Sequence, residues 1–302
     1  MLDGIFMEEQ GTDVDTVVRG GVYNSPSPRG HIVGDGVYVP FPESLYPESP
    51  DTRMLTPDKV RSVEVDENYP FLMKSFKEKA LHFLVYLGIF TLVFPLHILR
   101  YGLKIEGRAN LRKNRSLLKN GALTVSNHVY RWDFLAVLQA VRYRRLWFPT
   151  LADNLETKDK TLVRSAGGIP IPLNKIAATR KFYQAFDELS RKKKWIHVFP
   201  ESYRWEFYQP IRPFKIGAFE MAYRYGIPVI PVVIHYRPAG GWRKMLGIKH
   251  PLITVSIGEP IAPDTGNRRK QESERLCRAA HESMCRMAGI IQNKWDAVSD
   301  RP

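Results

Sequence analysis

The segment Val125–Leu135, VSNHVYRWDFL, contains a histidine and an aspartate whose spacing could serve acid–base chemistry. His128 and Asp133 are five positions apart, which on a continuous α-helix would turn their side chains about 140° away from each other. They can meet only across a turn. The apolar run that ends at Ser126 predicts a strand, and Asp133 precedes the periodic run FLAVLQAV, where aspartate is a favourable helix N-cap. A carboxylate there would orient one ring nitrogen and leave the other to accept a proton.

These two residues also have a simpler interpretation, in which Asp133 only caps its helix and His128 only forms local hydrogen bonds. Because the chain has eight histidines, such a pair can arise by chance, and the segment alone favours this interpretation. Other catalytic arrangements are not visible in the sequence: no cysteine lies beside a histidine in a motif, and no histidine–carboxylate cluster has metal-ligand spacing. Cys277 and Cys285 are eight apart in a predicted helix and are expected to be reduced thiols.

A second group of polar residues follows the apolar run 195–200. Glu201 and Arg204 come directly after that predicted strand, and Arg212 and Lys215 follow in IRPFKIG. The three basic side chains could together bind a phosphate, and Glu201 could organise the arginines or an acceptor hydroxyl. The alternative is a set of surface charges beside a turn. Their place after a strand favours a site, because α/β folds hold ligands at the carboxyl ends of their strands.

The elements that must position these residues alternate along the chain from about residue 104. Runs of strand length are apolar throughout, as expected for a sheet that is buried on both faces. The sequence therefore predicts an α/β fold. The predicted strands are residues 122–126, 145–152, 195–200, 229–236 and 252–258, and the predicted helices are residues 133–143, 175–193, 217–225 and 269–294.

Charge is unevenly distributed along the 302 residues. Residues 1–70 hold 5 Lys+Arg against 13 Asp+Glu, with 8 prolines. This composition predicts an extended or disordered lead segment, and the interpretation we favour is a flexible tail without a specific function. The remaining residues hold 40 basic against 18 acidic side chains. Such a basic body favours an anionic partner: nucleic acid, an anionic membrane surface or phosphorylated small molecules. Nucleic acid is the weakest of these, since no RNA-binding signature, zinc finger or helix-turn-helix is visible.

The most apolar stretch is Leu81–Leu99, LHFLVYLGIFTLVFPLHIL. As a helix its 19 residues would be about 28 Å long, close to the minimum for crossing a bilayer, but His82, His97 and Pro95 weaken it as a span. Three interpretations stay open: a helix or helical hairpin immersed in one leaflet, which we favour, a true span, or a buried core helix. The chain thus divides into a lead segment (1–70), an apolar membrane-associating segment (71–103) and a domain (104–302).

Several motifs resemble those of the glycerolipid acyltransferase family, whose members acylate glycerol 3-phosphate, lysophosphatidic acid and related lysophospholipids. NHVYRWD resembles the family's N-H-x4-D motif, and FPESYR resembles its F-P-E-G-T-R block. GIPVIPVVI resembles its V-P-I-V-P-V block, AGGIPIPLN lies where its second block is found, and VSIGEPI matches the strand that usually closes the domain. The motifs follow the family's order over roughly residues 100–262. The resemblance implies a mixed, largely parallel sheet flanked by helices, preceded by a membrane-associating helix or hairpin.

The resemblance also implies a role for each matching residue. His128 would be the general base that deprotonates the acceptor hydroxyl, and Asp133 would orient it. The block that contains Glu201 and Arg204 would bind the phosphate of the acceptor. The hydroxyl would attack an acyl thioester, supplied by acyl-CoA or acyl carrier protein, and the reaction would need no metal, no cofactor and no covalent enzyme intermediate.

Two departures from the family's pattern affect the acceptor side. The third block reads Glu-Ser-Tyr-Arg where Glu-Gly-Thr-Arg is usual, so Arg212 is a substitute for Arg204 as the phosphate ligand. The second block usually ends in arginine, but the matching position here is Asn174, a further candidate for acceptor binding. Asn127 and Gly168, in the first and second motifs, are expected to support the site. These changes resemble a divergent bacterial branch.

The predicted function is acyl transfer at a membrane surface, with 1-acylglycerol 3-phosphate as the first acceptor. The alternatives are another acceptor, either glycerol 3-phosphate or a lysophospholipid with a larger headgroup, and a lipid-binding protein that has kept the fold but lost turnover. Anionic membrane lipids are expected partners, because the basic runs RYRR, RKKK and RRK add to the charge beside the apolar stretch. The acidic N-terminus lacks the basic region of a signal peptide. Cys277 and Cys285, as reduced thiols, are typical of a cytosol-facing protein, so the protein is expected on the cytoplasmic face of the membrane.

Overall fold

The computed structural model describes most of the predicted domain and parts of the lead segment. It describes residues 31–32, 37–41, 46–54, 65–141, 144–155, 160–172, 175–247 and 250–299. Most of the predicted lead segment therefore lies outside the described residues. Within its described parts, Phe41, Met54 and Val65 are buried in the hydrophobic clusters of the domain, so these parts lie along the body of the protein.

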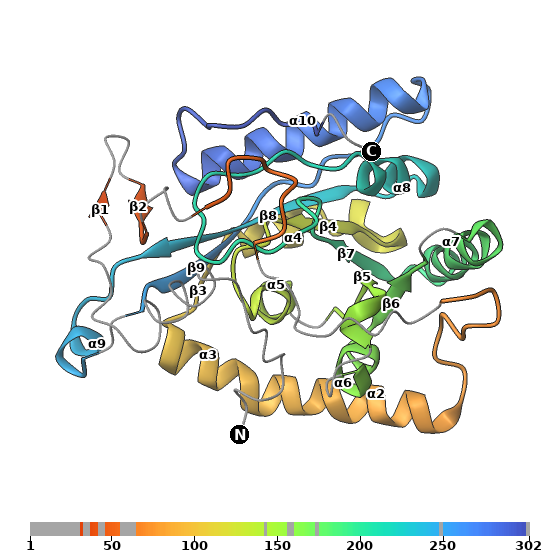
Figure 1. The fold of residues 1–302 in the computed structure, drawn as a ribbon, viewed down its shortest axis with the longest axis horizontal. Coiled ribbons are helices and arrows are strands. Elements are labelled where there is room, and N and C mark those ends of the chain that lie inside the picture. The colour runs from red at the N-terminus through yellow and green to blue at the C-terminus, as the bar shows by residue number, and fades with distance from the viewer. Residues whose placement is uncertain are drawn as a thin grey trace.

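A seven-stranded sheet forms the centre of the structure (Figure 1). Neighbouring strands run parallel, except that β8 and β9 are antiparallel. The expected mixed, largely parallel sheet is thus confirmed. In spatial order its strands are β3 (Lys104–Glu106), β9 (Leu252–Ile257), β8 (Val229–Arg237), β4 (Leu123–Ser126), β7 (Trp195–Val198), β5 (Leu146–Leu151) and β6 (Gly168–Ile171), and a separate ribbon pairs β1 (His31–Ile32) with β2 (Tyr38–Val39).

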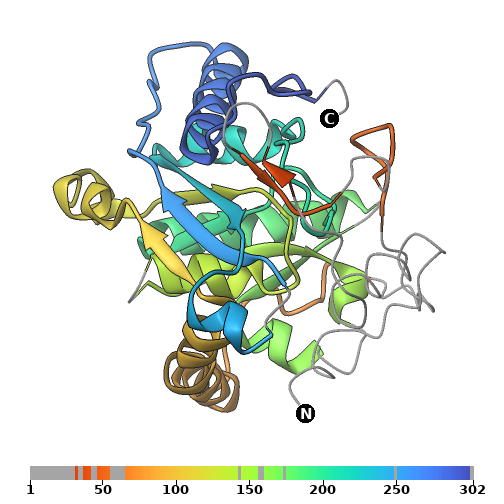
Figure 2. The same cartoon turned by 90° about the vertical axis from the view of Figure 1, so that its left-hand side faces the viewer.

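Helices cover both faces of this sheet (Figures 1 and 2). The helices and helical turns are α2 (Phe76–Gly88), η3 (Ile89–Val93), α3 (Phe94–Tyr101), α4 (Arg108–Lys113), η4 (Leu117–Asn120), α5 (Asp133–Ala140), η5 (Ala152–Leu155), α6 (Lys160–Ser165), α7 (Ile176–Arg191), α8 (Gly217–Tyr225), α9 (Trp242–Met245) and α10 (Arg269–Ala288). Helices α7, α8 and α10 share one hydrophobic cluster with Leu123 and Val125 of β4. Helices α2, α3 and α5 share the other with Val232 and Ile234 of β8, so the sheet is buried on both faces.

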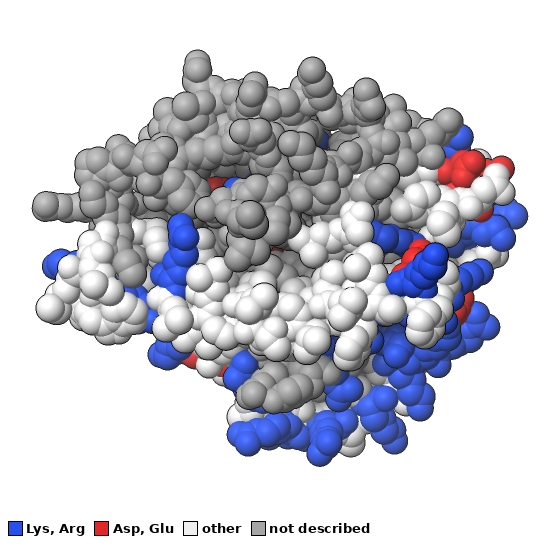
Figure 3. All heavy atoms as spheres, turned by 90° about the horizontal axis from the view of Figure 1, so that it is seen from below, with Lys and Arg blue, Asp and Glu red and all other residues white. Residues whose placement is uncertain are grey.

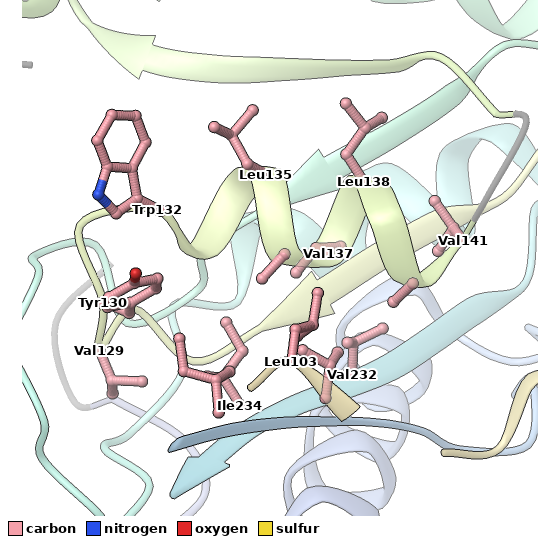
Figure 4. Packing of buried hydrophobic residues seen from close by; sticks show 14 of the residues in the cluster. Leu103, Val129, Tyr130, Trp132, Leu135, Val137, Leu138, Val141, Val232 and Ile234 are labelled. Atoms are coloured by element: carbon pink, nitrogen blue, oxygen red, sulfur yellow. The ribbon is translucent and has the colours of Figure 1, made fainter. Parts of the chain in front are cut away.

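Helix α5 is buried almost all round between the sheet and the helices α2 and α3. In Figure 4, Val137 faces Leu103 and Val232, whereas Leu135 and Leu138 point away from them. A helix with apolar side chains on all sides is stable only inside a protein. Its burial fixes the position of its first residue, which matters for the site described below.

The apolar stretch Leu81–Leu99 is the middle of one continuous helix of 26 residues, Phe76–Tyr101, and forms no hairpin. A capping box begins the helix at Ser75, and Gly102, with φ of 57°, ends it. The π-helical turn η3 lies just before Pro95, where a proline ring would clash with the carbonyl of a regular helical turn. Among the described residues, this is the one helix long and apolar enough to cross a membrane.

Candidate active site

The structure brings His128 and Asp133 together on the loop between β4 and α5. The Nδ1 atom of His128 lies 2.5 Å from Oδ2 of Asp133, a hydrogen bond in which the ring N–H donates to the carboxylate. The side chain of Asp133 is 3% exposed and that of His128 is 21% exposed. The carboxylate is therefore sequestered, while the imidazole has access to the surface. In this arrangement Nε2 is the ring atom that can exchange a proton with a substrate.

Asp133 is the first residue of α5, where the sequence suggested its N-cap. The N-cap is Trp132, whose side chain makes no capping hydrogen bond. The Oδ1 atom of Asp133 accepts a hydrogen bond of 2.7 Å from the backbone N–H of Phe134, while Oδ2 holds His128. The free N–H groups and the positive end of the helix dipole stabilise a carboxylate at this position. One residue thus serves both the helix and the histidine.

Asn127 holds the histidine loop against the neighbouring strand β8. Its Nδ2 donates to the carbonyl of Ile234, and its Oδ1 accepts from the N–H of the same residue, both at 2.8 Å. On the other side, the backbone N–H of Trp205 donates to the carbonyl of His128 at 2.9 Å. The loop is therefore fixed on two sides, and Asn127 has the position of the supporting residue that the sequence predicts.

The block after β7 contacts His128 directly. The ring of Phe199 stacks on the imidazole, with centroids 4.1 Å apart and planes 17° from parallel. The Oε2 atom of Glu201 accepts a hydrogen bond of 2.8 Å from the backbone N–H of His128. The first and third sequence motifs therefore form one site. The contact with Phe199 was not predicted, because sequence spacing does not indicate which ring of an apolar strand turns toward the loop.

Glu201 and Arg212 form a fully buried ion pair behind the histidine. The Glu201 carboxylate accepts from the Arg212 backbone N–H at 2.9 Å and from its guanidinium at 3.0 Å. The guanidinium also stacks on Trp205 at 4.5 Å and donates to the carbonyls of Tyr203 and Pro50. Burial lowers the pKa of Arg212, and the adjacent Glu201 charge acts in the opposite direction. This geometry favours a positioning role for Arg212, and its predicted contact with phosphate stays a prediction.

Arg204 and Lys215 are the partly exposed cations of the predicted acceptor site. Their side chains are 22% and 24% exposed. Arg204 pairs with Glu206 at 3.4 Å, and Lys215 pairs with Asp51 at 3.1 Å. With the Glu201–Arg212 pair included, each of the three predicted phosphate-binding cations has an acidic partner within the protein.

The lead-segment residues 46–54 lie across this block. Trp205 Nε1 donates to the carbonyl of Thr52 at 2.9 Å, and the hydroxyl of Tyr46 donates to the carbonyl of Glu206 at 2.8 Å. Together with the Asp51–Lys215 pair, these contacts attach residues 46–54 to the acceptor block. No sequence motif signalled this contact, because the residues that meet are about 160 positions apart.

Gly168 and Asn174 both belong to the second motif, but the structure describes only Gly168. Gly168 is the first residue of β6, and a Cβ atom there would lie 2.9 Å from the carbonyl oxygen of Val163. Glycine is therefore needed for the close packing of β6 on α6, and in this way Gly168 supports the fold. Asn174 lies outside the described residues, so its predicted acceptor contact stays a prediction.

A second histidine, His197 on β7, lies next to the site and was not singled out from the sequence. It is fully buried, and its Nδ1 lies 2.9 Å from the hydroxyl of Thr124. Burial lowers its pKa to about 3, with the nearby His128 as a second cause. His197 is therefore neutral at ordinary pH and places no positive charge beside the imidazole of His128.

The segment that contains the histidine loop also matches a known family. Residues 102–235 match the family model described as Acyltransferase, the family that the sequence motifs resemble. The crystal structure of the 1-acyl-sn-glycerophosphate (LPA) acyltransferase PlsC from Thermotoga maritima is similar to this chain, with 23% sequence identity, coverage of 70% of this chain and 84% of that chain, and a TM-score of 0.44. A comparison with curated proteins gave no match.

Proposed function

We propose that this acyltransferase moves a fatty acyl group from a thioester donor to the free hydroxyl of a lysophospholipid at the cytoplasmic face of a membrane. The donor is acyl-CoA or acyl carrier protein, and 1-acylglycerol 3-phosphate is the first candidate acceptor. The observation that carries the proposal is the 2.5 Å hydrogen bond between the partly exposed His128 and the buried Asp133, inside the segment that matches the acyltransferase family.

In the proposed reaction His128 acts as a general base. Its Nε2 accepts the proton of the acceptor hydroxyl, and the oxygen attacks the thioester carbonyl. The carbon–oxygen bond forms, the carbon–sulfur bond breaks, and the imidazolium returns the proton to the leaving thiolate. The Asp133 carboxylate stabilises the positive imidazolium through Nδ1–H, and Phe199 fixes the plane of the ring.

The paired cations favour one of the alternative acceptors. A phosphate monoester carries nearly two negative charges at neutral pH. In the described site, Arg204 and Lys215 already face Glu206 and Asp51, so a dianion must compete with these carboxylates. A lysophospholipid with a larger headgroup of lower net charge meets less repulsion. Both acceptors therefore belong in the test.

Activity is tested with a panel of donors and acceptors. Purified protein is expected to release free thiol from acyl-CoA, or from acyl carrier protein, only when a lyso-acceptor is present. Thiol release and the acylated product are measured together for glycerol 3-phosphate, 1-acylglycerol 3-phosphate and a zwitterionic lysophospholipid. Tight binding of these lipids without turnover for any pair of donor and acceptor would instead identify a lipid-binding protein.

The charge of the acceptor site is tested by the substitution Asp51→Asn. Removal of this carboxylate takes away a competitor of the phosphate for Lys215, so the KM for 1-acylglycerol 3-phosphate should fall by up to about fivefold, since ion pairs near the surface contribute about 0.2–1 kcal/mol. The kcat should not change. The matched control is Asp187→Asn, which breaks the exposed pair with Arg224 on α8. An unchanged KM in Asp51→Asn would place the phosphate away from Lys215.

A further inference from the structure

The helix Phe76–Tyr101 packs on the domain along its length. Near its start, the His82 ring nitrogen Nδ1 lies 2.5 Å from the carbonyl oxygen of Ser165. One turn later, the Tyr86 hydroxyl donates to the carbonyls of Leu146 and Ala166 at 3.1 and 3.0 Å. The buried side chains of the helix are His82, Tyr86, Ile89, Phe94, His97 and Tyr101.

The opposite face of this helix is apolar and exposed to solvent. Its large exposed side chains are Phe76, Leu81, Phe83, Leu84, Leu87, Leu92, Leu96, Ile98 and Leu99. Soluble proteins rarely expose a continuous apolar surface of this extent, and such a surface marks a contact with a membrane or another protein.

The short helix α9, which follows β8, extends this apolar surface. Two apolar side chains of α9 are exposed, Trp242 and Met245, the latter by 87%, and Leu246, which follows the helix, is 69% exposed. The guanidinium of Arg243 donates to the carbonyl of Ile98 at 2.9 Å, which ties α9 to the end of α3. Two views agree that α9 lies beside the end of the long helix (Figures 1 and 2). The two elements therefore present their apolar side chains on one side of the molecule.

Basic residues surround the combined surface. Lys74, Lys77 and Lys79 stand at the beginning of the long helix, and Arg100 and Lys244 stand at the other end, all of them exposed. Seen from below, the uncharged side chains form a white band with lysines and arginines beside it (Figure 3). Each basic side chain near an anionic bilayer contributes about 1 kcal/mol to binding. The basic residues at both ends of the apolar band therefore favour an anionic lipid bilayer as the partner.

We propose that α9 is a second membrane-contacting element, and that the helix Phe76–Tyr101 and α9 together lie in the surface of an anionic bilayer. The helix does not cross the bilayer. As a helix of 26 residues it is about 39 Å long, and it contacts the domain from His82 to Ile98. A transmembrane orientation would pull the charged domain into the hydrocarbon, which costs several kcal/mol for each charged side chain. This inference rests on the membrane-surface part of the proposed function and adds how the protein docks.

In the proposed docking geometry, the candidate active site lies at the start of a helix that packs against the membrane-contacting helix. Helix α5 lies between the long helix and the sheet, and Gln139 of α5 contacts the carbonyl of Phe94 at 3.5 Å. Asp133 is the first residue of the same helix. A lysophospholipid can then keep its acyl chain in the leaflet while its headgroup approaches His128. A single helix in the membrane surface could rotate about its axis. A second contact through α9 would prevent this rotation and fix the orientation of the domain.

The contact is tested by attaching an environment-sensitive fluorophore to introduced cysteines. Met245→Cys reports on α9, and Ile291→Cys is the matched control, because Ile291 is exposed and follows closely after α10, a helix that lies across the sheet from the long helix (Figure 1). The native Cys277 and Cys285 are buried, and burial raises the pKa of these thiols to about 12 and about 11, so both label slowly. Labelling of the unmodified protein measures this background.

With vesicles of phosphatidylcholine and phosphatidylglycerol, the label at Met245→Cys should shift to the blue and be quenched by brominated lipids, whereas the label at Ile291→Cys should do neither. Labels at Leu84→Cys, Leu92→Cys and Leu99→Cys should report equal, shallow depths. A label on α9 that stays in water while the vesicles bind the protein would overturn its role. A Leu92 label much deeper than the other two would indicate a span.

A second measurement needs no label. The double substitution Met245→Ser and Leu246→Ser should weaken partition into the same vesicles by about tenfold or more, because two apolar side chains no longer enter the lipid. Both positions are exposed, so the fold should be unaffected, and this is checked by thermal unfolding. Binding is measured without donor or acceptor. A protein that binds vesicles but transfers no acyl group would therefore contradict the proposed reaction alone, and unchanged binding of the double variant would contradict α9.

Discussion

Replacement of His128 by alanine is expected to reduce kcat by about 10²- to 10⁴-fold, the contribution usual for a positioned general base. In the proposed reaction the imidazole takes the acceptor proton, and its Nδ1 is held by Asp133 while its ring is stacked on Phe199. Its side chain is 21% exposed, so its loss should leave the fold intact. The measurement is thiol release from the best donor and acceptor of the panel, with circular dichroism as the check of folding.

The matched control for this substitution is His250→Ala. His250 lies before β9, where its ring contacts Tyr101 and its Nδ1 lies 3.2 Å from the carbonyl oxygen of Pro251. Its loss should leave kcat within about twofold of the unmodified protein, because its ring packs on Tyr101 of the long helix and takes no part in the proposed reaction. Asp133→Asn should also lower kcat, because the amide keeps the shape but cannot stabilise an imidazolium. Undiminished transfer by His128→Ala would remove the histidine from the mechanism.

The His128–Asp133 contact was accessible from the sequence because it is local. Five positions separate the two residues, and the signals for a strand end and a helix start lie between and around them. The strands β4, β5, β7, β8 and β9 begin and end within two residues of their predicted positions, since each is a continuous apolar run. Local pattern and burial agree in these elements, so the pattern suffices.

The elements that the sequence did not reveal are short or depend on distant contacts. Strand β3 has three residues and lies at the edge of the described sheet beside β9, and β6 has four residues that include Pro170, so neither shows a strand pattern of its own. Helix α10 ends at Ala288 rather than at residue 294, because Gly289 adopts φ of 76° and caps it. The glycine is visible in the sequence, but the apolar residues that follow it suggested that the helix continues.

The acceptor side shows the same limit more strongly. The sequence places Arg204, Arg212 and Lys215 in one short segment, and their spacing does not indicate which of them binds a phosphate. The difference between them comes from tertiary contacts, since Arg212 is buried by Trp205, Glu201 and the carbonyl of Pro50, which is 162 positions away. Burial of a charged side chain next to an acid cannot be read from local pattern.

That difference leads to the largest expected effect on stability. Arg212→Ala leaves the Glu201 carboxylate buried without its ion-pair partner, so the free energy of unfolding should fall by about 3–5 kcal/mol. Arg204→Ala removes a partly exposed cation whose ion pair with Glu206 is 3.4 Å long, and should cost less than about 1 kcal/mol. Urea denaturation of the two variants measures both values. In the activity assay, Arg204→Ala should raise the acceptor KM with little change in kcat.

A double-mutant cycle separates a structural arginine from a phosphate ligand. If Arg212 serves to neutralise Glu201, then Glu201→Gln combined with Arg212→Ala should be more stable than Arg212→Ala alone, because no uncompensated charge stays buried. A phosphate ligand would behave differently: Arg212→Ala would keep the stability of the unmodified protein and raise the acceptor KM, and the second substitution would rescue nothing. The cycle therefore assigns Arg212 by stability and Arg204 by KM, in two assays that fail independently.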